Sequence, residues 1–203
     1  MEVVDLTNPV DSDTPTHPDD PDMEMEEAAT VEEDGYAVKR LVLPSHLGTH
    51  VDAPAHMFGD GRTVDDYPVK RFVGEAVVID ARGEDVVDIG RERVDEDADM
   101  LLFRTGDDSA AYDGGYSGGG PVLTERTAEA CVSAGADLVG IDSGSPDESP
   151  YPVHDILLGN DILLLENLTN LGAVTGERFL CYALPLNIAE GDGAPCRVVG
   201  VID

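Results

Sequence analysis

The sequence predicts a strand-rich α/β fold in one domain, with one or two main helices. The chain has 203 residues, a length that suits a single compact domain over 1–203. Hydrophobic residues make up 41% of it, which is enough to bury a core. The apolar runs are short and rich in Val and Ile, which favour strands. This pattern is typical of a mixed domain built on a sheet or a barrel.

The predicted strands are short apolar runs bounded by turn-forming residues. In chain order they are Glu2 to Leu6, Tyr36 to Leu43, Glu75 to Asp80, Asp99 to Arg104, Asp137 to Ile141, Ile162 to Glu166, Phe179 to Leu186 and Arg197 to Ile202. The run at Glu75 to Asp80 is β-branched and nearly unbroken in its apolar character, which indicates a buried strand.

Leu123 to Ala134 is the clearest helix of the sequence. Thr124 is a candidate N-cap before its first turn, and Gly135 stands where a helix ends in a left-handed residue. Val153 to Leu158 and Val87 to Val94 are predicted to be shorter helices.

Three stretches are predicted to be irregular. Apart from its opening strand, the segment 1–35 is interpreted as an N-terminal arm that contributes to the substrate site or to a subunit contact, because 8–22 are rich in proline and aspartate. Pro44 to Arg62 contains several glycines and prolines, which argues against a regular helix. Tyr112 to Pro121 is glycine-rich and is predicted to be a loop. Its glycine run lacks the Lys and Ser/Thr of a phosphate-binding loop.

The charge balance excludes two classes of partner. The chain carries 43 acidic residues against 12 basic ones, a formal net charge of -31. Such a surface repels nucleic acid and anionic membranes.

The sequence shows no basic leader followed by an apolar stretch and no run long enough to span a bilayer, so a cytoplasmic location is expected. The three cysteines form no C-x-x-C pair, which argues against a disulfide framework or a thiolate zinc site.

The acid excess also predicts that stability depends on salt. Acidic residues alternate with well-formed apolar runs, so the chain is expected to fold, and its like charges then repel each other in the compact state. Salt screens this repulsion, as the cytoplasm of a halophile would. We therefore expect the melting temperature to rise in molar KCl or NaCl. A melting temperature that stays flat or falls with added salt would contradict this expectation.

Three of the five histidines and one aspartate lie within the eleven residues that read H-L-G-T-H-V-D-A-P-A-H. They are His46, His50, Asp52 and His56, all at even spacings, which places them on one face of an extended chain. Neighbours two apart are separated by roughly 7 Å at the backbone, so their side chains can close on one ion. His46 is too far from the others unless the chain bends, and Gly48 permits a bend.

These donors suit a catalytic metal. Imidazole nitrogen and carboxylate oxygen bind Zn and also Mn or Fe(II), and three protein ligands leave a position open for water. The alternative is a surface cluster or a hydrogen-bonded core histidine. That alternative is weaker here, because the rest of the chain contains only His17 and His154.

A second candidate segment runs from His154 to Leu171. Glu166 ends the continuous apolar strand that begins at Ile162, and a carboxylate there is costly unless it is paired or bound to a metal. The structural alternatives are a strand that exits into water at Glu166 and a solvent-exposed helix start at His154.

The segment from Ser45 to His56 resembles the signature H-x-G-T-H-x-D-x-P-x-H of the cyclase family, which includes the bacterial-type kynurenine formamidases and the isatin hydrolases. Asp5-Leu6-Thr7, Thr105-Gly106, Gly140-Ile141-Asp142 and Glu166-Asn167-Leu168 resemble other parts of that family, so the likeness spans nearly the whole chain.

The resemblance implies a swivelling β/β/α fold, a homodimer or homotetramer, and one or two Zn or Mn ions in each subunit. It implies a proton-transfer role for His56. It also implies metal ligands at His46, His50, Asp52, His154 and Glu166, with Asp52 between two ions. Formamidases of the family carry a W-P-G-D-like stretch that contacts the aromatic substrate. Here the matching place reads His17-Pro18-Asp19-Asp20, which makes His17 a candidate substrate contact with weaker stacking than Trp, or else an exposed arm residue.

We therefore predict a metal-dependent hydrolase that opens an amide-type C–N bond. The ion would lower the pKa of a bound water from about 15.7 to about 7. The hydroxide would attack a carbonyl, and His56 would carry a proton to the leaving nitrogen. The first candidate is an arylformamidase, which converts N-formyl-L-kynurenine and water to L-kynurenine and formate. The second hydrolyses a cyclic amide such as isatin, or a related lactone or ester. A metal-binding protein without catalysis is the alternative of another class.

Overall fold

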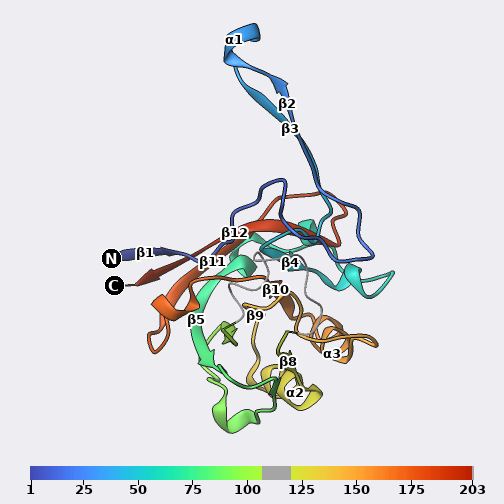
Figure 1. The fold of residues 1–203 in the computed structure, drawn as a ribbon. Helices are drawn as coiled ribbons and strands as arrows, with labels where there is room; N and C mark the ends of the chain where they lie inside the picture. Colours follow the sequence, from blue (N-terminus) through green and yellow to red (C-terminus); the bar gives the residue numbers. More distant parts are fainter. Residues whose placement is uncertain (107–119, 203) are drawn as a thin grey trace.

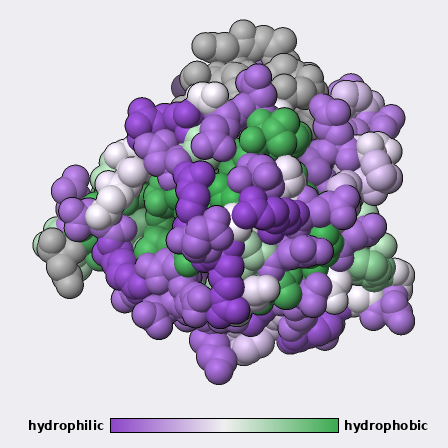
Figure 2. Space-filling view, turned by 90° about the horizontal axis from the view of Figure 1, so that it is seen from below, coloured by the Kyte–Doolittle hydropathy of each residue, from purple (hydrophilic) through white to green (hydrophobic). Residues whose placement is uncertain are grey.

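The computed structural model describes residues 1–106 and 120–202 of the chain (Figure 1). Most of the predicted glycine-rich loop Tyr112 to Pro121 therefore lies outside the described residues. No helix within the described ranges is long and apolar enough to cross a membrane. Figure 2 shows one face of the molecule, which is covered largely by hydrophilic residues with a few hydrophobic groups between them.

A barrel-like sheet forms the centre of the molecule, as the prediction of a strand-rich α/β domain requires. Its strands follow the order β12-β11-β5-β7-β9-β10-β4, and β4 pairs again with β12, so seven strands close a ring. The neighbours β5, β7, β9 and β10 run parallel, and the other pairs are antiparallel. The bounds of these strands are His50–Asp52 (β4), Val73–Asp80 (β5), Met100–Arg104 (β7), Leu138–Ile141 (β9), Leu163–Glu166 (β10), Phe179–Pro185 (β11) and Gly193–Ile202 (β12).

The chain termini meet at the edge of this ring. Strand β1 (Glu2–Asp5) pairs antiparallel with the end of β12, so the N- and C-termini lie side by side (Figure 1). The remaining short elements connect the strands on the surface. They are β6 (Val86–Val87), β8 (Val122–Leu123) and the 3-10 turns η1 (Pro54–His56), η2 (Val64–Asp66), η3 (Val69–Phe72), η4 (Arg91–Arg93) and η5 (Leu171–Ala173).

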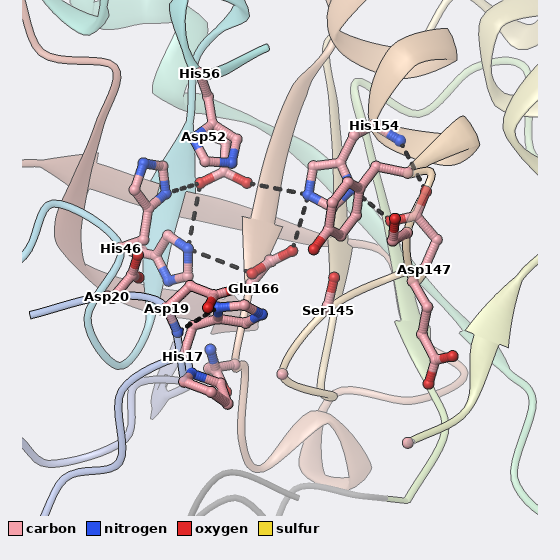
Figure 3. A pocket seen from close by; sticks show the side chains of 18 of the residues that line it. His17, Asp19, Asp20, His46, Asp52, His56, Ser145, Asp147, His154 and Glu166 are labelled. Atoms are coloured by element: carbon pink, nitrogen blue, oxygen red, sulfur yellow. Dashed lines mark hydrogen bonds and ion pairs between the residues drawn. The ribbon is translucent and has the colours of Figure 1, made fainter. Parts of the chain in front are cut away.

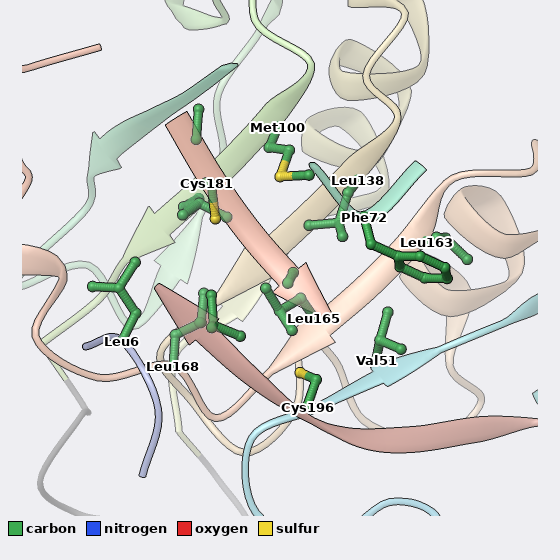
Figure 4. Packing of buried hydrophobic residues seen from close by; sticks show 14 of the residues in the cluster. Leu6, Val51, Phe72, Met100, Leu138, Leu163, Leu165, Leu168, Cys181 and Cys196 are labelled. Carbon is green, nitrogen blue, oxygen red and sulfur yellow. The ribbon is translucent and has the colours of Figure 1, made fainter. Parts of the chain in front are cut away.

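The parallel strands are buried on both faces because alternate side chains enter two separate cores. Met100, Leu138 and Leu165 belong to the cluster inside the barrel (Figure 4). Leu101 and Phe103 belong to the cluster on the outer face. That outer cluster lies under the helices α2 (Glu125–Ala134) and α3 (Pro152–Gly159). Both faces are thus apolar, which explains why the strands read as short unbroken apolar runs.

The helix predicted at Leu123 to Ala134 is present as α2, with the expected ends. The Thr124 side chain accepts a hydrogen bond from the Thr127 backbone, and Gly135 has a left-handed φ of 79°. The helix predicted at Val87 to Val94 is wrong. Val87 ends β6, which pairs with β8, and η4 follows as a single 3-10 turn. The physical reason is that Val87 and Ile89 are both buried, at a spacing that suits an extended chain.

The prediction that 1–35 is irregular beyond its opening strand is also wrong in part. Strand β2 (Glu24–Ala29), the helical turn α1 (Val31–Asp34) and strand β3 (Val38–Val42) form a hairpin that projects from the barrel (Figure 1). Glu24 to Ala29 carries no β-branched or aromatic residue, so its strand pairing has no signal in local composition. The pairing instead follows from the partner strand β3, which is rich in Val and Leu.

Candidate metal centre

One cavity of about 560 Å³ opens on the outer side of β4 and β10, beside the start of α3. Val51 points into the barrel, so its neighbours His50 and Asp52 on β4 point outward. In the paired strand β10, Glu166 stands directly opposite His50. All the residues predicted for the site line this cavity: His17, His46, His50, Asp52, His56, His154 and Glu166.

The bend that the sequence required between His46 and His50 lies at Gly48, whose φ is +60°. A residue with a side chain is strained in this left-handed conformation, whereas glycine adopts it freely. The turn also places the Gly48 carbonyl 2.8 Å from His50 Nδ1. The rings of His46 and His50 meet edge to face as a result, with their centroids 5.1 Å apart.

Two groups of possible ligands share one carboxylate (Figure 3). In the first group, Asp52 Oδ1 lies 2.7 Å from His46 Nδ1 and 3.2 Å from His50 Nε2. In the second group, His154 Nε2 lies 3.8 Å from Asp52 Oδ2 and 3.4 Å from Glu166 Oε1. Glu166 Oε2 also approaches His50 Nε2 at 3.3 Å. The geometry therefore brings the two distant sequence segments together around Asp52.

Each histidine of these groups is held through its second ring nitrogen. His46 Nε2 contacts Asp192 Oδ2 at 3.0 Å, and His154 Nδ1 contacts Asp147 Oδ1 at 2.6 Å. His50 uses the Gly48 carbonyl in the same way. Outer partners of this kind fix the ring orientation and the tautomer of a metal-binding histidine.

Sequence reasoning missed Asp147, Asp192 and Gly193 as parts of the site. A Cβ atom at position 193 would lie 2.6 Å from His46 Cε1, so a glycine is needed for the ring to sit there. The two aspartates carry no local signal, because the chain contains 43 acidic residues. Only the three-dimensional structure separates these two from the rest.

The electrostatics of the site favour a bound positive charge. Asp52 and Glu166 are 1% and 6% exposed, although carboxylates are rarely buried unless they are paired. Burial disfavours the charged form of His154 most strongly, yet the surrounding carboxylates outweigh burial and raise its pKa to about 10. The same balance raises the pKa of His50, and the adjacent imidazoles lower the pKa of Asp52 against the effect of burial.

One buried acceptor is left without a hydrogen bond. Glu166 Oε1 lies 3.4 Å from His154 Nε2, close enough for an ion pair, but no group among the described residues hydrogen-bonds to it. An unpaired buried carboxylate oxygen costs free energy unless a cation occupies its lone pair. Imidazole nitrogens and carboxylate oxygens are also the donors that Zn and Mn accept. The residues present therefore fit one or two divalent cations.

His56 lies at the rim of the two groups rather than within them. It ends the 3-10 turn η1, and its ring centroid lies 4.0 Å from that of His46 and 6.0 Å from that of His154. Its Nδ1 is 3.8 Å from Asp192 Oδ2. Partial burial lowers the pKa of His56, whereas the pKa values of His46, His50 and His154 are raised. The ring faces the cavity in Figure 3.

His17 reaches the same cavity from the N-terminal segment (Figure 3). The backbone N–H of Asp19 donates to His17 Nδ1 at 3.3 Å, and the backbone N–H of Asp20 donates to the His17 carbonyl at 2.9 Å. This tight turn presents the imidazole toward the cavity, where the sequence predicted a substrate contact.

The overall fold is shared with known hydrolases. Isatin hydrolase A from Labrenzia aggregata, solved with benzyl benzoate, superposes with a TM-score of 0.85 and 27% identity, covering 98% of this chain and 93% of that one. A structure described as a potential metal-dependent hydrolase with cyclase activity superposes with a TM-score of 0.80 and 25% identity, covering 98% and 96%. The fold and the cluster of histidines and carboxylates thus place the chain among hydrolases of this type.

The family follows from the sequence comparison. The model of the Cyclase family matches residues 4–148, and the chain belongs to this family. The kynurenine formamidase of Salinibacter ruber is 34% identical over 208 residues, covering 98% of this chain and 97% of that protein. The kynurenine formamidase of Bacillus cereus is 31% identical over 206 residues, with 98% and 96% covered. The chain is therefore a hydrolase of the cyclase family.

Proposed function

We propose that this hydrolase uses a divalent metal to open an amide-type C–N bond, and that its reaction is arylformamidase: N-formyl-L-kynurenine and water give L-kynurenine and formate. The observation that carries the proposal is the convergence of four ligand-type side chains around the carboxylate of Asp52, from segments more than a hundred residues apart. The kynurenine formamidases among its relatives support this choice of substrate.

The ligands in this proposal form two groups that share Asp52. His46 and His50 would hold one Zn or Mn ion with it, and His154 and Glu166 would hold a second. When bound, a divalent cation supplies Lewis acidity, which makes water more acidic and polarises a carbonyl oxygen. The outer partners of the histidines keep the ligand nitrogens facing the shared carboxylate.

His56 is the proposed proton carrier. Its ring lies beside both groups and borders the cavity, and its nitrogens lie outside the two groups centred on Asp52. From this position it would accept a proton from the attacking water and deliver it to the nitrogen of the leaving amine, which must be protonated to depart. Without that proton, the amine would have to leave as its anion when the C–N bond breaks, and that anion is a poor leaving group.

Hydrolysis of a cyclic amide is the second candidate. The isatin hydrolase likeness supports it, and His17 stands at the cavity where the resemblance implies a Trp in the formamidases. An imidazole ring offers less stacking area than an indole, so the site holds an aryl group less firmly. Both candidate substrates carry an aryl ring, so the isatin hydrolase likeness is the observation that favours this candidate.

The test is a paired assay on full-length protein purified without chelator. Elemental analysis gives the metal content, and N-formylkynurenine and isatin are assayed side by side with added Zn or Mn. Faster turnover of N-formylkynurenine supports the arylformamidase. Preference for isatin moves the protein to the second candidate. Fully metal-loaded protein that turns over no amide, lactam or ester would leave only a metal-binding role.

We also propose that the projecting hairpin of β2, α1 and β3 docks on a second copy of the chain to form a homo-oligomer. A two-stranded hairpin alone is marginally stable in water. Every residue of β3 is exposed, including Val38, Leu41 and Val42. Contact with a second copy would bury these apolar side chains, which the single chain leaves in water.

Removal of the hairpin is therefore expected to yield a monomer. Residues 24–42 are replaced by a short Gly-Ser linker, and light scattering after size exclusion gives the mass of both proteins in molar KCl. Wild-type protein should elute as a dimer or tetramer and the shortened protein as a monomer that still binds metal. A shortened protein with the same number of subunits as wild type would show that the hairpin does not mediate assembly.

A further inference from the structure

Asp147 connects the start of a helix to one of the candidate ligands. It lies in the loop before α3 and is 6% exposed, although it is not a member of either ligand group. Its Oδ2 accepts hydrogen bonds from the backbone N–H groups of Val153, at 2.6 Å, and His154, at 3.2 Å. Its Oδ1 lies 2.6 Å from His154 Nδ1. One carboxylate thus serves two backbone donors and one ring nitrogen.

The backbone contacts make Asp147 the cap of α3. Tyr151, the residue at the N-cap position, has a left-handed φ of 62° and makes no side-chain capping bond. The first N–H groups of a helix lack intrahelical acceptors and require a partner. Asp147 supplies that partner from outside the helix. It therefore fixes the position of the first turn of α3, where His154 lies.

The contact with the ring has a separate chemical consequence. An ionised carboxylate only accepts hydrogen bonds, so His154 Nδ1 must carry the hydrogen in this contact. The lone pair of the neutral ring is then on Nε2, the atom that faces Asp52 and Glu166. A metal binds only the nitrogen that carries the lone pair.

We propose that Asp147 is a positioning residue that fixes the tautomer of His154 and thereby controls occupancy of the ligand group of Asp52, His154 and Glu166. The inference rests on the metal centre of the proposed function. The group of His46, His50 and Asp52 is independent of this control, because its rings are oriented by Asp192 and by the Gly48 carbonyl.

The substitution Asp147→Asn separates this role from helix capping. The amide oxygen of Asn still accepts from the backbone of Val153 and His154, so the cap is kept. The amide nitrogen faces His154 and donates to Nδ1, which moves the ring hydrogen to Nε2 and blocks that atom as a ligand. Asp147→Ala removes both the cap and the ring contact. Asp155→Asn is the matched control, because it removes one exposed carboxylate from the same helix.

The experiment titrates zinc into metal-free full-length protein and its three variants, and records the melting temperature of each metal-free form. We expect the Asn variant to lose one zinc ion per chain, or to bind it 10–100-fold more weakly, about the loss typical for an outer partner. Its zinc binding should be no stronger than that of the Ala variant, because the Asn amide blocks Nε2, while its melting temperature stays above that of the Ala variant. Asp155→Asn should behave as wild type in both measurements.

Three outcomes would overturn the inference or its basis. Unchanged zinc stoichiometry and affinity in the Asn variant would overturn the positioning role alone. If zinc affinity ranked the proteins in the same order as their melting temperatures, with the Asn variant between wild type and the Ala variant, Asp147 would be only a helix cap. Wild-type protein that binds neither zinc nor, in a parallel titration, manganese would overturn the proposed function itself, and this result is distinct from the other two.

Discussion

Replacement of Asp52 by Asn is expected to abolish binding of both cations and to bring turnover to background. Asp52 is the residue common to the two main ligand groups. Its Oδ1 serves His46 and His50, while its Oδ2 faces His154. The amide of Asn has a neutral oxygen in one position and an N–H donor in the other, so it offers neither group an anionic ligand. Elemental analysis and the substrate assay measure the two losses.

The Asp52 variant also loses a buried negative charge, so its folding needs a control. Breaking a buried ion pair by removing one partner costs about 3–5 kcal/mol. Circular dichroism in molar KCl shows whether the variant is folded, and Asp155→Asn provides a charge-matched protein in which both ions should remain. A folded Asn variant that retains both ions would show that Asp52 does not bridge them.

The first ligand group could be predicted from the sequence because its signal is local. His46, His50 and Asp52 lie within seven residues, and Gly48 marks the turn that closes them. The meeting with Glu166 could not be derived from periodicity, because it depends on the register of β4 against β10. A shift of one residue in that register would turn the ligands of β4 to the barrel interior.

Other features lacked any local signal. Asp147 and Asp192 are two acids in a strongly acidic chain, and only their contacts with imidazole nitrogens distinguish them. The helix predicted at Val87 to Val94 failed because the segment is short and tertiary pairing with β8 decided its conformation. The hairpin strand β2 is specified by its partner strand rather than by its own composition.

The second large effect is expected at His56. Its replacement by Ala should reduce turnover by about 10²–10⁴-fold, the usual contribution of a general acid–base, while the metal content stays near that of wild type. The reason is positional: the ring borders the cavity, with its centroid 6.0 Å from that of His154. Added imidazole should restore part of the turnover, because the substitution leaves space at the cavity rim for the missing ring.

A rival role for His56 follows from a third cluster. His46, His56 and Asp192 offer ligand atoms within 4.8 Å of one another, so a cation there would make His56 a ligand instead. The two roles differ in metal content rather than in activity, because both predict a slow enzyme. A His56 variant that loses one ion per chain, with turnover that excess Zn or Mn restores and imidazole does not, would exclude proton transfer as its role. Retained metal with rescue by imidazole would exclude the ligand role.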